Sequence, residues 1–195
     1  MGYSLILDTS NRLLCVGVAD EDKVLSKIQY EAWQRQSEFC LKEVEKVLNE
    51  NNLTARQINR IVVTIGPGSY TGVRIALTIA KTLAMVNDCP ICAISSLQAM
   101  CGNKGKKISL MDARSKRAYI GIYEDGKEVE KNKVLPLVEI SEIIKNNPDF
   151  EVVGDANLLG LETKEIDMIE NMFELSKGIE DVDNTYTLVP NYLKD

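Results

Sequence analysis

Apolar and polar residues alternate along the first part of the chain with a period of two, which is typical of β-strands. Three strands are predicted, over Tyr3–Asp8, Leu13–Ala19 and Val24–Tyr30, with short polar turns between them. From Ser37 to Asn49 the apolar residues recur instead at helical spacing. This second pattern predicts an amphipathic helix with one apolar face.

The middle of the chain joins a β-branched strand to an apolar helix through a glycine-rich turn. The strand covers Ile61–Ile65, and its uninterrupted β-branched composition is typical of a buried parallel strand. The turn has the sequence GPGSYTG, Gly66–Gly72, and the helix continues to about Val86. A further strand is predicted over Ile91–Ile94, followed by a short helix.

The same order of elements begins again after residue 103. Aligned without a gap, Asp8 matches Asp112 and Gly17 matches Gly121. The later elements expected are helices over 138–145 and 164–177 and a strand over 151–154. A duplicated β-β-β-α-β-α unit predicts the α/β fold of the actin-like ATPases, the ASKHA or ribonuclease-H-like fold. The two lobes are expected at residues 1–103 and 104–195, with the second lobe reduced.

The helix after the glycine-rich turn is apolar around most of its circumference, although a helix on a sheet needs only one apolar face. Ala76, Ala80 and Ala84 recur at every fourth residue, so another helix could approach closely there. Either the helix is wholly buried in its own fold, or one apolar side meets another protein, which we favour. The residues expected at that partner surface are Phe39, Leu41, Val44, Tyr70, Val73, Arg74, Leu77, Ala80, Lys81 and Ala84.

Candidate chemistry is sparse. The chain has no histidine, which removes the most common metal ligand and general base. GPGSYTG lacks the spacing and the lysine of a P-loop, so a tight strand-to-helix turn is favoured over a phosphate cradle. Asp8 and Asp112 end matching strands, where actin-like ATPases bind a magnesium phosphate, but no glycine follows either one. They stabilise turns, or they belong to a vestigial or shared nucleotide site comprising Asp8, Thr9, Ser10, Asp112 and Arg114.

The net charge and the cysteines limit the partners and the cellular compartment that the chain is expected to have. The net charge is −6, so the chain as a whole repels a phosphodiester backbone. Five cysteines without a secretion signal are expected as free thiols, and Cys89-Pro-Ile-Cys92 leads into a strand rather than a redox-active helix. The apolar run at the N-terminus is too short for a membrane span or signal peptide, so a cytoplasmic location is expected.

Five segments occur in order along the chain: ILDTS, GPGSYTGVRIA, ISSLQA, DARSKRAYIGIY and VPNYLK. Together they resemble the TsaB family, also called YeaZ. The resemblance implies an actin-like but non-catalytic subunit, with no metal or cofactor of its own, that pairs with the catalytic subunit TsaD. With the ATPase TsaE, such a complex transfers a threonylcarbamoyl group to adenosine 37 of ANN-decoding tRNAs.

The resemblance also implies where the partners bind. The family's two helices, matching 37–49 and 71–86, bind TsaD, and they form a homodimer when TsaD is absent. The tRNA would be bound only through the complex, and ATP or ADP would sit at the complex interface. The chain departs from the family pattern at Gln36, at Lys194 and in its shorter second lobe.

Two other functions remain open from the sequence. The chain could be a stand-alone nucleotide-binding phosphotransferase that uses Asp8 and Asp112. It could also be a structural protein that only associates with itself.

Overall fold

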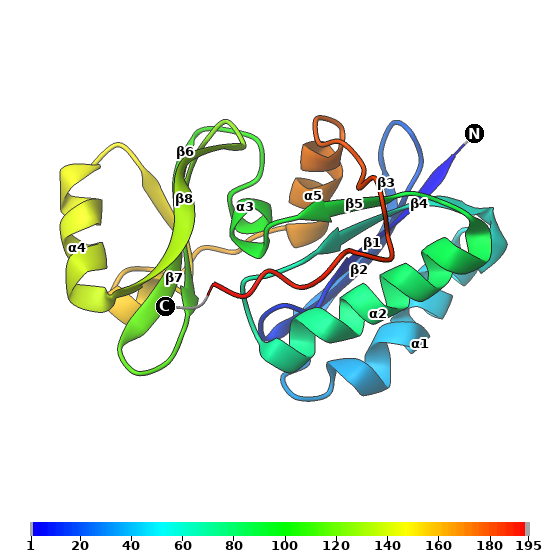
Figure 1. Cartoon of the computed structure of the whole chain (residues 1–195), viewed down its shortest axis with the longest axis horizontal. Helices are drawn as coiled ribbons and strands as arrows, with labels where there is room; N and C mark the ends of the chain where they lie inside the picture. Colours follow the sequence, from blue (N-terminus) through cyan, green and yellow to red (C-terminus); the bar gives the residue numbers. More distant parts are fainter. Residues whose placement is uncertain (1, 194–195) are drawn as a thin grey trace.

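Two β-sheets side by side define two lobes in the computed structural model, which describes residues 2–193 (Figure 1). The first sheet has the strand order β3-β2-β1-β4-β5, and the second has the order β8-β7-β6-β9. The strands of the first sheet are β1 Tyr3–Asp8, β2 Leu13–Ala19, β3 Val24–Glu31, β4 Ile58–Thr64 and β5 Ile91–Ile94. Those of the second are β6 Lys106–Asp112, β7 Arg117–Glu124, β8 Lys127–Pro136 and β9 Glu151–Gly154.

Each lobe repeats the same topology. Three antiparallel strands are followed by a helix and by a strand that pairs in parallel with the first strand of the lobe, as β1 does with β4 and β6 with β9. The helices are α1 Gln36–Glu50, α2 Tyr70–Asn87, α3 Ser96–Cys101, α4 Leu137–Asn146 and α5 Met168–Ser176. Every strand and longer helix predicted from the sequence is present, and the duplicated α/β, actin-like fold is confirmed.

Helices cover both faces of the first sheet. Helices α1 and α2 lie on one face and bury a core that includes Leu5, Leu7 and Val63. The opposite face buries Ile6, Cys15 and residues of α3 and α5. The second sheet carries α4 on its outer face, where Ile140 packs into a smaller separate core. Alternation along each strand explains this arrangement, because successive side chains point to opposite faces.

The two copies are shifted relative to each other by one residue. Leu7 pairs with Val16 in the first hairpin, and Leu110 pairs with Ile120 in the second. Eight residues separate Leu7 from Val16 and nine separate Leu110 from Ile120, so the second hairpin is one residue longer. When Leu7 is matched to Leu110, Asp8 corresponds in space to Met111 rather than to Asp112. The alignment without a gap is wrong at this point. A one-residue shift in a strand moves a side chain to the other face of the sheet.

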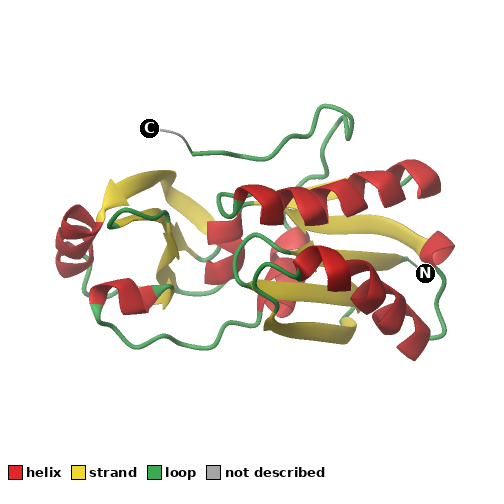
Figure 2. Cartoon of the chain, turned by 90° about the horizontal axis from the view of Figure 1, so that it is seen from below, coloured by secondary structure: helices red, strands yellow, loops and turns green. Residues whose placement is uncertain are grey.

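The end of the chain returns to the first lobe. We expected residues 104–195 to form the second lobe, but α5 packs into the core of the first sheet through Ile169, Phe173 and neighbouring residues. Gly17 leaves room for this helix, because a Cβ there would lie 2.5 Å from Ile169 Cγ2. After α5 the chain runs alongside α2, as Figures 1 and 2 both show. Lys194 lies outside the described residues. None of the helices between residues 2 and 193 is long and apolar enough to cross a membrane.

Candidate functional site

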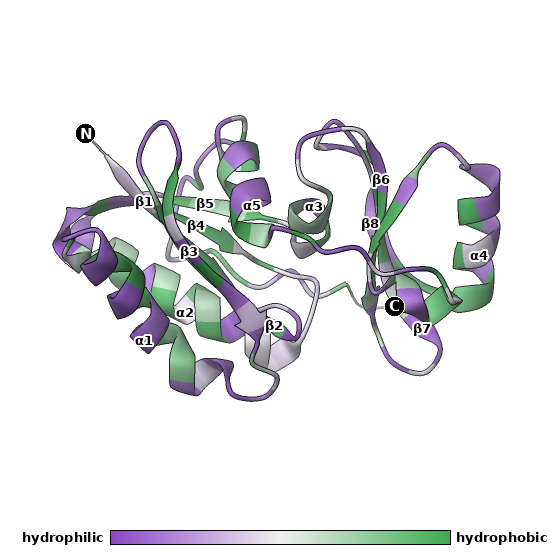
Figure 3. Ribbon diagram, turned by 180° about the vertical axis from the view of Figure 1, so that it is seen from behind, coloured by the Kyte–Doolittle hydropathy of each residue, from purple (hydrophilic) through white to green (hydrophobic). Residues whose placement is uncertain are grey.

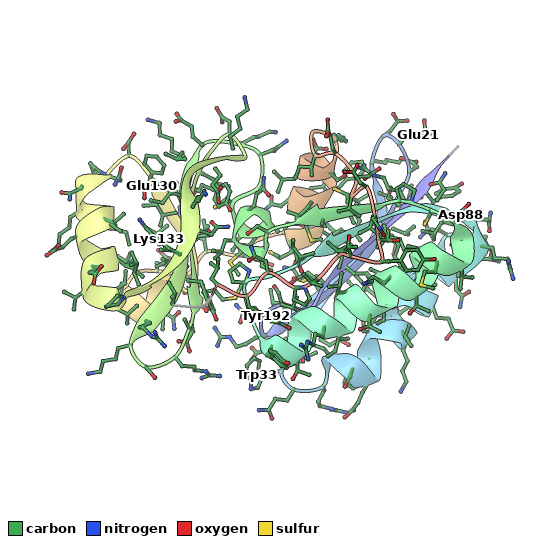
Figure 4. The ribbon with its side chains drawn as sticks, in the orientation of Figure 1. Glu21, Trp33, Asp88, Glu130, Lys133 and Tyr192 are labelled. Carbon is green, nitrogen blue, oxygen red and sulfur yellow. The ribbon has the colours of Figure 1, made fainter. Side chains whose placement is uncertain are left out.

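A polar cleft of about 690 Å³ separates the two lobes. Its first-lobe wall includes Arg12, Trp33 and Tyr70, and its second-lobe wall includes Arg114 and Tyr119. Figure 4 shows Trp33 next to the first turn of α2, at the end that faces the second lobe. The guanidinium carbon of Arg114 lies 5.9 Å from the centre of the Trp33 ring, so the two walls approach each other across this opening.

Asp155 links the two walls on the inner side of the cleft. Its Oδ1 accepts a hydrogen bond from Arg12 Nη2 at 3.2 Å, and its Oδ2 accepts one from the backbone N–H of Asp112 at 2.8 Å. Asp112 Oδ1 in turn accepts from the backbone N–H of Arg114 at 2.8 Å. Asp112 and Arg114 therefore lie at the cleft, where they bond to each other within one hairpin turn, and their contact with a nucleotide stays a prediction.

The first half of the expected nucleotide site is buried. Asp8, Thr9 and Ser10 are each at most 1% exposed. Asp8 Oδ1 accepts hydrogen bonds from Thr64 Oγ1 and from the Ser10 backbone N–H. Burial raises the pKa of Asp8, although the hydrogen bonds from Thr64 and Ser10 act in the opposite direction. Asp8 lies at the floor of a second cavity of about 360 Å³, with almost no surface open to it.

Thr9 and Ser10 are enclosed beside Asp8. Thr9 Oγ1 donates to the Gly72 carbonyl at 2.6 Å and accepts from the Ala76 N–H at 3.1 Å. Ser10 Oγ is buried without a hydrogen-bond partner, enclosed beneath the glycine-rich turn. The side chains of Asp8 and Thr9 join β1 to β4 and α2, which agrees with the structural alternative for Asp8. Contact of these three residues with a nucleotide stays a prediction.

The glycines of GPGSYTG are explained by close backbone contacts. A Cβ at Gly68 would lie 2.3 Å from the Ser10 carbonyl oxygen, and a Cβ at Gly72 would lie 2.2 Å from that of Thr9. Ser69 caps the following helix by accepting a hydrogen bond from the Gly72 N–H at 3.2 Å. The turn is thus a tight strand-to-helix connection around the end of β1, which was the favoured prediction.

Helix α2 buries most of its apolar surface against its own sheet. Five of the ten residues expected at a partner surface lie in the core of the first lobe: Val44, Val73, Leu77, Ala80 and Ala84. This corrects the sequence-based assignment. The alanine repeat (Ala76, Ala80 and Ala84) is buried in the core that α1 and α2 form with the sheet, so it is not part of an exposed surface. Figure 3 shows α2 mostly green and white beside the more hydrophilic α1.

A shallow apolar groove remains between α1 and α2. Its volume is about 470 Å³, and its lining is Ser37, Leu41, Tyr70, Thr71, Arg74, Ile75, Thr78 and Ile79. Leu41 and Tyr70 are each about 60% exposed, and Ile75 and Ile79 form a half-buried floor. Small threonine side chains on the exposed face of α2 would let another helix approach closely.

The other expected surface residues surround this groove. Phe39 on α1 is half-buried, and the Arg35 guanidinium carbon lies 4.5 Å from the centre of its ring. Arg74, which lines the groove, and Lys81 both hydrogen-bond to the C-terminal segment that runs along α2. Half of the expected surface residues are thus accessible: Phe39, Leu41, Tyr70, Arg74 and Lys81.

Sequence reasoning missed several residues at these sites. Ile75, Thr78 and Ile79 line the groove, and no periodic pattern separates Ile75 and Ile79 from the core residues of the same helix. Asp155 directly follows a predicted strand, a position typical of functional side chains in α/β folds, and this signal was overlooked. Tyr192 contacts Tyr70 and Arg74 across a long separation in sequence that no local pattern reveals.

The remaining candidates for chemistry are few. Among residues 2–193, no group of three or more His, Cys, Asp or Glu side chains is placed to bind a metal ion. The five cysteines are buried free thiols. Burial raises the pKa of Cys92 to about 11 and also raises that of Cys89, so the C-x-x-C pair lacks the lowered pKa of a redox motif.

Comparisons with known proteins agree on one family. Residues 29–151 match the model of the family described as TsaD, tRNA N6-adenosine threonylcarbamoyltransferase. The tRNA threonylcarbamoyladenosine biosynthesis protein TsaB of Bacillus subtilis is 30% identical, with 97% of this chain and 93% of that protein aligned.

Two solved structures share the fold over the whole chain. One is described as an uncharacterized protein with similarity to peptidase YeaZ from Pseudomonas aeruginosa; it has a TM-score of 0.84, 22% identity and complete coverage of both chains. The other is YeaZ from Pseudomonas aeruginosa, with a TM-score of 0.79 and 22% identity, covering 99% of this chain and 100% of that one.

Proposed function

Because the chain belongs to the TsaB (YeaZ) family, we propose that it is the accessory subunit of a tRNA threonylcarbamoyladenosine-forming complex. In this proposal it binds a TsaD-type catalytic subunit and activates it, together with a TsaE-type ATPase. The product is the modified adenosine 37 of ANN-decoding tRNAs, formed in the cytoplasm. The match to the TsaD family model supports this, since a subunit related to its partner can use a related surface for pairing.

The observation that carries the proposal is the groove between α1 and α2. It combines exposed Leu41 and Tyr70 with a floor of Ile75 and Ile79, all on regular helices that hold their side chains in fixed positions. Such a surface suits an amphipathic helix of a partner, which would bury its own apolar face there. In the absence of the TsaD-type subunit, a second copy of the chain would occupy the same groove.

A non-catalytic role agrees with the chemistry of the residues. The sequence contains no histidine, and the side chains of Asp8, Thr9 and Ser10 are buried and engaged within the protein. No cofactor is assigned to this chain, and ATP or ADP would bind where the partner contributes residues. The stand-alone phosphotransferase loses its main support with the burial of Asp8.

The charge of the chain limits its direct contact with tRNA. A net charge of −6 disfavours a phosphodiester backbone, so the tRNA is expected to be bound mainly by the partner subunits. The contribution of this chain is then to position and stabilise the catalytic subunit.

Reconstitution tests the proposal directly. TsaD-type and TsaE-type subunits, threonylcarbamoyl adenylate, ATP and an ANN-decoding tRNA are incubated with and without the chain, and the modified nucleoside is measured by mass spectrometry. We expect modification only when the chain is present, together with its co-purification with the TsaD-type subunit. Full modification without the chain, or modification by the chain alone, would contradict the proposal.

A further inference from the structure

The last residues of the chain form a strap along the first lobe, defined here as residues 178–193. Near its start, Asp181 forms an ion pair with Arg60 at 2.8 Å, and the Val182 N–H donates to the Ile91 carbonyl at 2.8 Å. The strap therefore begins at β5, the edge strand of the first sheet. Both views of the fold show it continuing alongside α2 toward the second lobe (Figures 1 and 2).

Polar groups fix the course of the strap along α2. Lys81 Nζ donates hydrogen bonds to the carbonyls of Tyr186 and Leu188, each at 3.0 Å. Farther on, the Asn191 N–H donates to the Ile65 carbonyl at 2.6 Å. These contacts use backbone atoms of the strap, so they position it with little dependence on its side chains.

Tyr192 ends this path at the first turn of α2. Its ring stacks on that of Tyr70 with centroids 5.2 Å apart, and its hydroxyl accepts a hydrogen bond from Arg74 Nε at 2.8 Å. The Arg74 guanidinium carbon in turn lies 3.8 Å from the centre of the Tyr70 ring. Figure 4 shows Tyr192 beside this end of the helix. Each of the three side chains, Tyr70, Arg74 and Tyr192, thus contacts the other two.

This set borders the groove between α1 and α2, because Tyr70 and Arg74 both line it. Both side chains are largely exposed, and a free arginine on a helix surface samples many rotamers. A partner that contacts them must otherwise restrict those rotamers on binding, at a cost for each side chain that it immobilises. Tyr192 has already restricted them before any partner arrives.

We propose that Tyr192 is a positioning residue of the partner-binding surface, which holds Tyr70 and Arg74 in the conformation that the TsaD-type subunit recognises. The inference rests on the proposed function, since it assumes that this subunit occupies the groove. The strap thereby makes the C-terminal end of the chain part of the interface without lining the groove itself.

The test measures binding of the full-length chain to the TsaD-type subunit by biolayer interferometry. Tyr192→Ala is expected to weaken binding about tenfold, mainly through faster dissociation, while Tyr192→Phe, which keeps the stacked ring, retains most of the affinity. Tyr186→Ala is the matched control, because the exposed Tyr186 side chain belongs to the same strap and only its backbone carbonyl bonds to α2.

A double-mutant cycle separates positioning from general loss of stability. If Tyr192 acts through Arg74, then Tyr192→Ala should weaken binding much less in an Arg74→Ala background. Additive effects of the two changes, or wild-type affinity of Tyr192→Ala, would overturn the inference while leaving the proposed function intact. Failure of the wild-type chain to bind the TsaD-type subunit would instead overturn both.

Discussion

Arg12 and Asp155 form an ion pair of 3.2 Å that connects the first lobe to the second across the cleft. The two partners differ in environment: the Arg12 side chain is 51% exposed, whereas that of Asp155 is 10% exposed. Asp155 also accepts the backbone N–H of Asp112, so it supports the second-lobe hairpin as well as the contact between lobes. Removing the Asp155 side chain should therefore destabilise the protein more than removing that of Arg12.

Asp155→Ala is expected to lower the free energy of unfolding by ~1–3 kcal/mol, because it leaves a partly buried N–H and a guanidinium without their acceptor. Arg12→Ala should cost less than about 1 kcal/mol, since half-exposed ion pairs contribute little. Urea unfolding of both variants measures the difference. Equal losses would show that the contact between lobes, and not support of the Asp112 hairpin, dominates the contribution of Asp155.

Leu41→Glu and Leu77→Glu should have opposite effects on folding and binding. Leu41 is exposed in the groove, so Leu41→Glu is expected to leave the melting temperature nearly unchanged and to reduce binding of the TsaD-type subunit at least tenfold. Leu77 lies on the buried face of α2, and an unpaired charge there should prevent stable folding.

Val138→Glu provides the matched control for the groove. Val138 is the most exposed of the large apolar side chains described, and it lies on α4 in the other lobe. The Val138→Glu substitution introduces the same charge as Leu41→Glu on an exposed helix, but outside the groove. Circular dichroism reports whether each of the three variants folds, and a pull-down with the TsaD-type subunit reports whether it binds. Intact binding by Leu41→Glu, or loss of binding by Val138→Glu, would contradict the assignment of the surface.

The sequence predicted where the strands and helices lie, but it did not show which side of helix α2 is buried and which is exposed. Alternation located β1 to β3, and uninterrupted β-branched residues located β4, because these patterns follow directly from burial on one or two faces. The pattern of α2 was ambiguous, since its apolar residues pack on the sheet, border α1 and contact the strap on different sides. Only the folded arrangement separates Leu77, which is buried, from Ile75, which lines the groove.

Two other features could not be predicted because they depend on contacts between segments far apart in the sequence. Asp8 and Asp112 appeared equivalent because a gapless alignment cannot detect the one-residue difference between the hairpin turns. That difference buries Asp8 and leaves Asp112 at the cleft. The position of α5 and of Tyr192 on the first lobe was equally hidden, since contacts between distant segments leave no periodic signal.

Gly72→Ala should destabilise the protein, although alanine is the better helix former. Replacing glycine in a helix interior normally gains ~1 kcal/mol. At Gly72 the new Cβ would lie 2.2 Å from the Thr9 carbonyl oxygen, a backbone atom that cannot move without disturbing β1. A net loss of ~1–3 kcal/mol is expected, as for other overpacked sites.

Gly178→Ala is the corresponding control, because the nearest atom to its new Cβ would be 3.9 Å away. This change should be neutral or slightly stabilising, through reduced freedom of the unfolded chain. Thermal unfolding of the two variants measures both effects. A more stable Gly72→Ala variant would show that the close contact around Thr9 does not constrain the turn.

Asp8→Asn should stabilise the protein increasingly as the pH rises. Burial raises the pKa of Asp8, so the folded state prefers the neutral acid. The stabilisation from protonated Asp8 is complete below the pKa of the unfolded chain, roughly 3.9, and is lost as the pH rises through the higher folded value. Asparagine is neutral throughout and can accept the same hydrogen bonds from Thr64 and Ser10.

The free energy of unfolding of wild type and Asp8→Asn, measured in urea at about pH 4 and pH 8, tests this coupling. The variant should gain over wild type at pH 8 and show little difference at pH 4. Asp112→Asn, at the exposed end of the other hairpin, should stay within about 0.5 kcal/mol of wild type. A loss of stability in Asp8→Asn at pH 8 would mean that the carboxylate is required in its charged form, which would return Asp8 to consideration as a functional group.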